Sequence, residues 1–385
     1  MWRAVASNAI TLLMVALFLL GGVILWGQSE YKAAGPLQEA ICLQVPRGST
    51  MARVSGDLQT QGAISNDVIF RLGADYTEKA QDLKAGSFLV PPGASMAEIV
   101  DIITRGGASS CGTEVVYRIG VARVTFELRE LDPATSRYVE KAEFDPAEGA
   151  VPEAFQQASA QAGTRHRVAL AEGVTSWQVV EGLKAIDPLQ GEVPELPAEG
   201  ALAPDSYEFQ AGDTRVEVLG RMAAAQDAIL AAAWEARAPG LPLSSPEEAL
   251  ILASIIEKET AVAEERRVVA SVFVNRLNRG MRLQTDPTVI YGITQGQGIL
   301  GRGLRQSELR RETPWNTYVI PALPPTPIAN PGRASIEAAL NPEQTDFVFF
   351  VADGTGGHVF AKTLAEHNAN VAKWRKIEAE RRAQD

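Results

Sequence analysis

Two glutamates stand at the end of an apolar segment, where a carboxyl group can act as a general acid. Residues 249–256, Ala-Leu-Ile-Leu-Ala-Ser-Ile-Ile, run directly into Glu257, Lys258 and Glu259. A carboxyl group at the end of a buried apolar helix loses hydration, which raises its pKa and lets it hold a proton near neutral pH. Such a group could protonate a glycosidic oxygen and later accept a proton.

The helical repeat does not choose between the two glutamates. Glu257 shares a stripe with Leu250, whereas Glu259 follows Leu252 on another side of the helix. Taken alone, an acidic pair after an apolar run is more often the beginning of the solvated end of a helix. The surrounding sequence must therefore decide.

Several elements are predicted to position this segment. Ser245 can cap a helix, Pro246 suits its first position, and Glu248 completes a capping box. A second helix is expected to include 271–277. Upstream, a strand near 167–172, a helix at 176–186 and a long helix at 216–236 are expected. These elements predict a mixed α+β fold.

Polar loops follow the glutamates. Four segments combine Gln, Asn, Asp, Thr or Tyr with glycines or with prolines, which make the backbone rigid. These segments are 280–292, 313–318, 323–332 and 350–360. Such loops suit a groove that hydrogen-bonds sugar hydroxyls and stacks on sugar rings.

In this order, the phrases resemble the MltG (YceG-like) family of endolytic murein transglycosylases, most strongly over residues 167–373. The resemblance implies that Glu257, the first acid of Glu-Lys-Glu-Thr, is catalytic. The chain departs from the family pattern at 201–203, where bulkier residues are usual, and at 112–163. The resemblance also implies a substrate-binding set around the site: Gln284, Asp286, Thr288, Tyr291, Asn316, Asn330 and His358.

The family resemblance implies a reaction and a setting. The enzyme would be a carbon–oxygen lyase (EC 4.2.2.-) that cleaves the MurNAc–GlcNAc bond of nascent glycan strands, leaves 1,6-anhydroMurNAc ends and limits strand elongation. Its partners would be the glycan strands and membrane-bound peptidoglycan synthases. Two alternatives stay open. One is a hydrolytic muramidase, which needs a second carboxylate such as Asp286. The other is a non-catalytic peptidoglycan-binding scaffold.

A smaller domain is expected before the catalytic one. The segments 45–51 and 90–96 each combine a strand end, a Pro/Gly turn and a Ser or Thr helix cap. Their strand-helix-helix-strand order weakly resembles a LysM-like subdomain. The predicted organisation is a cytoplasmic N-terminus at 1–8, a transmembrane helix at 9–26, a LysM-like subdomain at 40–106, an inserted β-rich segment with a loose linker at 107–164, and a YceG-like catalytic domain at 165–378.

The N-terminal segment 9–26 carries no charge and would span about 27 Å as a helix. Arg3 precedes it and Glu30 is the first charge after it, so the positive-inside rule predicts that the remainder is exported. A cleaved signal peptide is the competing interpretation, but no small-x-small cleavage pattern follows. We therefore expect a single-pass protein of the bacterial inner membrane with a periplasmic catalytic part.

Cys42 and Cys111 are the two cysteines, and both fall on the side expected to be exported. A disulfide and a pair of buried thiols are equally compatible with the sequence.

The composition excludes other classes of function. A net charge of -11 argues against nucleic-acid binding. The three histidines form no close ligand pairs, so no metal site is expected. The Gly-rich turn 354–357 has no P-loop lysine, and no cofactor is expected.

Overall fold

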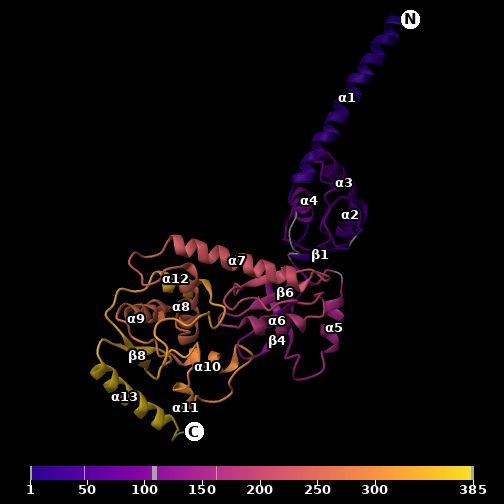
Figure 1. Ribbon diagram of the computed structural model, residues 1–385. Helices are drawn as coiled ribbons and strands as arrows, with labels where there is room; N and C mark the ends of the chain where they lie inside the picture. Colours follow the sequence, from indigo (N-terminus) through magenta and orange to yellow (C-terminus); the bar gives the residue numbers. More distant parts are fainter. Residues whose placement is uncertain (1, 47, 106–110, 162, 383–385) are drawn as a thin grey trace. The chain divides into compact units, whose positions relative to one another are not determined.

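The computed structural model describes residues 2–46, 48–105, 111–161 and 163–382 (Figure 1). The chain forms two compact units. The first contains residues 1–115, 127–143 and 151–165, and the second contains 116–126, 144–150 and 166–385. The fold is α+β.

The N-terminal helix α1 (Trp2–Lys32) is long and exposed over its apolar part. Its segment Thr11–Lys32 is long and apolar enough to cross a membrane. The last turn differs, because Tyr31 is buried in the core of the first unit. The Tyr31 ring fills the space where a side chain at position 73 would lie, which explains Gly73 in the facing helix α3 (Asp67–Tyr76). Glu30 also accepts a hydrogen bond of 2.7 Å from Ser65.

The first unit continues with a strand-helix-helix-strand sequence and a further helix. Strand β1 (Ile41–Val45) pairs antiparallel with β2 (Gly86–Val90). Polar caps begin the helices, as Ser95 does for α4 through a capping box with Glu98. The helices between and after the strands are α2 (Met51–Thr60), α3 and α4 (Met96–Thr104).

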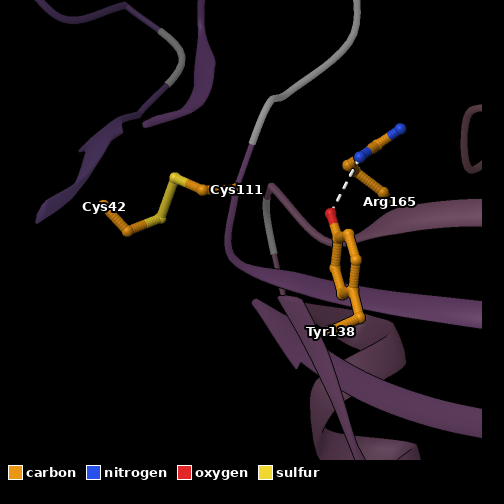
Figure 2. The surroundings of a disulfide bond; sticks show 4 residues. All are labelled: Cys42, Cys111, Tyr138 and Arg165. Atoms are coloured by element: carbon orange, nitrogen blue, oxygen red, sulfur yellow. Dashed lines mark hydrogen bonds between the residues drawn. A yellow bond between two sulfur atoms is a disulfide. The ribbon is translucent and has the colours of Figure 1, made fainter. Parts of the chain in front are cut away.

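Cys42 and Cys111 form a disulfide within the first unit, with their Cα atoms 5.8 Å apart (Figure 2). Of the two alternatives that the sequence left open, the structure therefore has the disulfide. Cys42 belongs to β1, and the backbone N–H of Cys111 donates to Ser87 of β2. Figure 2 also shows Arg165 donating to the Tyr138 hydroxyl at 2.9 Å, in the same unit.

The segment expected to be a loose linker contains regular structure. Strand β5 (Arg137–Phe144) and helix α5 (Glu153–Ala160) lie within it. The β5 pattern is hard to recognise because most of its side chains are polar and exposed. The strands β3 (Thr113–Ile119) and β4 (Val124–Asp132) lie in the same segment, which the sequence predicts to be β-rich.

Five strands form one sheet, in the order β5-β4-β3-β6-β7. Strand β6 (Arg165–Leu170) pairs antiparallel with β7 (Ser206–Phe209). The loop after β6 leads through Glu172 and Gly173 into α6 (Ser176–Lys184), which Thr175 and Gln178 begin with a capping box. This loop carries part of the site described below.

The core of the second unit lies among helices α8 (Pro246–Glu259), α9 (Arg266–Asn278) and α12 (Arg333–Leu340). Helix α8 is apolar on nearly every side because it is buried on nearly every side. The remaining elements are α7 (Arg215–Glu235), the 3-10 turn η1 (Ala263–Glu265), α10 (Asp286–Thr294), α11 (Gln306–Leu309), the antiparallel pair β8 (Phe349–Ala352) and β9 (His358–Ala361), and α13 (Leu364–Arg382).

Helix α8 begins as predicted, with one difference. Ser245 is the N-cap and its hydroxyl accepts the backbone N–H of Glu248 at 3.3 Å. The Glu248 carboxylate, however, accepts the backbone N–H of Ser244 instead of Ser245, at 2.6 Å. The hydrogen bond from the backbone to the Glu248 side chain therefore comes from the residue before the N-cap, so the predicted capping box is only half formed.

Candidate active site

Glu257 lies in the last turn of α8, half-buried, with one carboxylate oxygen fixed and the other available. Its Oε2 accepts the backbone N–H of Gly332 at 2.9 Å. Gly332 is the N-cap residue of α12 and makes no side-chain cap. Among the residues that the structure describes, no hydrogen-bond donor meets Oε1 of Glu257. The carboxylate is thus oriented by one bond and keeps an oxygen that can exchange a proton.

Glu172 is a second carboxylate beside Glu257, which the sequence analysis did not identify. Its carboxyl group occupies the place where a side chain at Gly332 would lie, so any larger residue there would have to displace Glu172. Burial and the charge of Glu257 raise the pKa of Glu172, and Arg266, whose Nη2 is 3.9 Å away, opposes the rise. The phrase Glu172-Gly173 between a strand and a capped helix was the signal in the sequence.

Lys258 bonds to the loop that follows β6. Its Nζ donates to the carbonyl of Gly173 at 3.1 Å. Burial lowers the pKa of Lys258, while the charges of Glu257 and Glu199 oppose that effect. Lys258 therefore ties the end of α8 to the loop that carries Glu172.

Glu199 was also missed, and it anchors Tyr291. Burial raises the pKa of Glu199, against hydrogen bonds from Ser176 and Tyr291. The Tyr291 hydroxyl donates to Glu199 at 3.2 Å, and its ring centroid lies 5.6 Å from that of Trp315. The pair of rings is an aromatic surface of the kind that packs against sugars.

Glu259 belongs to a separate cluster on another side of α8. The Thr285 hydroxyl donates to its Oε1. Burial raises the pKa of Glu259; the bond from Thr285 opposes this and the charge of Asp286 adds to it. Asp286 in turn accepts a hydrogen bond of 2.6 Å from Tyr318. The predicted second acid, Asp286, thus lies with Glu259, whereas Glu172 is the carboxylate that acts on Glu257.

His358 begins β9 after the Gly-rich turn. Glu265 accepts its backbone N–H at 2.9 Å and lies 2.8 Å from its Nδ1. The ring of His358 meets Phe350 edge-on, with centroids 5.3 Å apart. Within the described part of the chain, no group of three or more histidine, cysteine or acidic side chains could hold a metal ion.

Gln284 presents its side chain to solvent from a strained backbone. Its φ is 49°, in the left-handed region that non-glycine residues rarely adopt. Its N–H donates to the carbonyl of Thr317 at 3.2 Å, which holds the backbone in place. Such strain is often stored where a side chain must be aimed.

Three predicted site residues are fully buried, namely Thr288, Asn316 and Asn330. Thr288 bonds to Thr285 and Thr317, and Asn316 donates to three carbonyls at the end of α11 and just after it. Their side chains offer no exposed atom to a ligand in this structure.

Asn330 joins the two segments around Glu257. Its backbone exchanges bonds of 2.9 and 2.8 Å with Gly173 and Val174, and its side chain accepts the N–H of Leu202. Because Gly332 follows two residues later, Asn330 sets the position of Gly332 opposite Glu172. Its geometry is that of a positioning residue.

The fold and this acidic site define an α+β protein with carboxylates grouped at the end of a buried helix. The YceG-like family profile matches residues 43–373. The chain belongs to the YceG-like family.

Similar proteins span most of the chain. An endolytic murein transglycosylase of Bacillus subtilis strain 168 is 26% identical over 372 residues, covering 92% of this chain and 91% of that protein. An endolytic murein transglycosylase of Streptococcus pneumoniae strain D39 is 29% identical over 340 residues, covering 86% of this chain and 58% of that protein. A crystal structure of a YceG-like protein from Listeria monocytogenes is 26% identical, covers 86% of this chain and 99% of that one, and has a TM-score of 0.46.

Proposed function

We propose that this protein is an endolytic peptidoglycan lytic transglycosylase with Glu257 as its acid and base. The observation that carries the proposal is the family match over 43–373, because it includes the Glu257 phrase and all the polar loops around it. The names of the relatives supply the reaction class.

The mechanism uses one carboxyl group twice. Protonated Glu257 donates its proton to the glycosidic oxygen between MurNAc and GlcNAc as the C1–O bond breaks. Glu257, now ionised, accepts the proton of the C6 hydroxyl of the same MurNAc. That oxygen bonds to C1 and closes the 1,6-anhydro ring. The Gly332 N–H orients the carboxylate, and Oε1 is the atom that exchanges the proton.

The predicted binding residues divide into two roles. We assign substrate contact to four residues with exposed or half-buried side chains: Gln284, Asp286, Tyr291 and His358. We assign positioning of the loops to the three buried ones: Thr288, Asn316 and Asn330.

A hydrolytic muramidase is the second candidate, and Glu172 is the observation that favours it. A hydrolase needs a second carboxylate to activate water or to stabilise the sugar cation. Glu172 interacts with Glu257 and is partly exposed, with 45% of its side-chain surface accessible. It fits this role better than Asp286, which lies with Glu259.

We further propose that α1 is retained as a single-pass anchor in the bacterial inner membrane, with both units on the periplasmic side. The absence of a small-x-small cleavage pattern after the apolar segment supports retention. The first unit, with its β1-α2-α3-β2 order, would be the LysM-like subdomain. Beside the membrane, the enzyme would meet nascent strands from peptidoglycan synthases and limit their elongation.

Mass spectrometry of peptidoglycan digested by the purified full-length chain tests the reaction. The proposal predicts fragments that end in 1,6-anhydroMurNAc. Reducing MurNAc ends, each heavier by one water, would instead establish the muramidase. Binding to peptidoglycan without soluble products would establish the scaffold.

A further inference from the structure

A cavity of about 460 Å³ in the second unit is lined by residues of α7, η1, α9 and α12 and by residues next to these elements. Its volume is within the range of sites for small ligands. Six alanines line it, and three arginines, Arg266, Arg267 and Arg333, bring positive charge to it. Glu337 is the one acidic side chain that lines it.

The arginines have unused hydrogen-bonding capacity. Arg333 makes no ion pair or side-chain hydrogen bond with the residues that the structure describes. Arg267 donates through Nε to the carbonyl of Asn341 at 2.8 Å, and its two terminal nitrogens have no partner in the same part of the chain. The Nε of Arg266 is buried without a partner among those residues. Because that Nε is buried, the donors open to an anion are the terminal nitrogens of Arg267 and Arg333, whose side chains are exposed.

The cavity adjoins the candidate active site through two residues. Arg333 directly follows Gly332, whose N–H holds Glu257. Arg266 faces Glu172, with Nη2 3.9 Å from its Oε2. The cavity therefore shares Arg266 with the surroundings of the proposed acid, and Arg333 of the cavity is adjacent in sequence to Gly332.

We propose that this cavity binds a free carboxylate of the peptidoglycan stem peptide. This inference rests on the proposed function. The stem peptide is attached to the lactyl group of the MurNAc that is cleaved, so its carboxylates are tethered to that sugar. Arginine guanidinium groups bind carboxylates through paired, charge-assisted hydrogen bonds.

Kinetics with two forms of one substrate test the assignment. Full-length wild type and the double variant Arg267→Gln/Arg333→Gln are given glycan strands with stem peptides, and the same strands with the stem-peptide carboxylates converted to amides. The wild type should show a kcat/KM for the strands with free carboxylates about tenfold above that for the amidated strands, the effect of one retained charge-assisted contact. The double variant should bring this ratio close to one. Arg375→Gln on the exposed α13 is the matched control and should keep the wild-type ratio.

Direct binding separates this inference from the proposed function. A dye-labelled stem pentapeptide should bind wild type more tightly than the double variant, and amidation of its carboxylates should abolish the difference, even if neither protein cleaves glycan. A ratio near one in the wild type, or a ratio that the double variant leaves unchanged, overturns the inference. Loss of binding to phosphatidylglycerol vesicles in the double variant, with unchanged peptide binding, also overturns it and makes the cavity a lipid-headgroup site.

Discussion

Glu257 and Glu259 are separated by one residue, yet their carboxylates have different partners. Glu257 meets a backbone N–H and the neighbouring Glu172, whereas Glu259 is held by Thr285 beside Asp286. Burial raises the pKa of Glu259. Burial alone therefore does not choose the acid, and the family resemblance is what assigns the role to Glu257.

The raised pKa of Glu259 has a consequence for stability. A carboxyl group with a higher pKa in the folded than in the unfolded chain binds more protons when the chain is folded. The free energy of unfolding therefore falls as the pH rises from the pKa of the unfolded chain through that of the folded chain. Glu259→Gln removes this dependence. We expect the thermal midpoint of the wild type, relative to the variant, to fall as the pH rises above about 4.3. A difference between the two midpoints that is constant with pH would contradict the burial of an ionisable Glu259.

The contact between Glu172 and Gly332 predicts a local defect. Gly332→Ala places a methyl group where the Glu172 carboxylate lies, and that flexible side chain must move. We expect cleavage to fall roughly ten- to hundredfold through displacement of the site, with little change in the thermal midpoint. Gly303→Ala is the control, because open space surrounds that position.

The double variant Gly332→Ala/Glu172→Ala tells displacement apart from loss of Glu172 itself. If Glu172 only needs to stay clear of Glu257, the second change restores activity. If Glu172 takes part in catalysis, as in a muramidase, activity stays low. Wild-type activity in Gly332→Ala alone would show that the contact has no bearing on the site.

At the scale of elements, the features that could be predicted from the sequence are those determined by residues close together in the chain. The beginning of α8 at Ser245, its burial and the helix α9 follow from capping and periodicity, and all three are present. Glu172 and Glu199 escaped prediction because their relation to α8 depends on tertiary packing of loops distant in sequence. Strand β5 escaped because its polar, exposed pattern resembles that of a linker.

The cap of α8 can be tested without touching the site. Ser245→Ala removes the hydroxyl that accepts the N–H of Glu248, and we expect the free energy of unfolding to fall by about 1 kcal/mol. Chemical denaturation of the second unit measures it. Ser244→Ala is the matched control, since only the backbone N–H of Ser244 is used. Equal effects of the two changes would contradict the assigned cap.

At the scale of the whole molecule, the disulfide and the N-terminal helix both bear on the cellular compartment in which the protein resides. A disulfide that persists requires an oxidising environment, which agrees with export of both units. The sequence left this bond undecided because spacing alone does not bring two cysteines together.

Removal of the disulfide should destabilise the first unit. The bond closes a loop between residues 69 positions apart, and the entropy of such a loop corresponds to about 4 kcal/mol. We expect Cys42→Ser/Cys111→Ser to lower the thermal midpoint of the first unit, and reductant to have the same effect on the wild type. A wild-type thermal midpoint that reductant does not change, together with free thiols detected in the untreated protein, would contradict the presence of the disulfide.

Retention of α1 is measured by the intact mass of the protein from membranes. We expect the mass of the chain with Trp2–Lys32 still attached, and a protein that alkaline carbonate does not extract. A mature chain that begins after the apolar segment, recovered in the soluble fraction, would identify the segment as a signal peptide.

The central claim is that Glu257 transfers the proton in glycan cleavage, and the rate of cleavage by Glu257→Gln tests it most directly. The measurement compares release of soluble fragments from purified sacculi by wild type, Glu257→Gln and Glu259→Gln, each shown to be folded by its thermal midpoint. We predict that Glu257→Gln slows release by about a thousandfold, the contribution of a general acid and base, while Glu259→Gln retains most of the rate. Wild-type release by Glu257→Gln together with loss of release in Glu259→Gln would contradict the account and move the acid to Glu259.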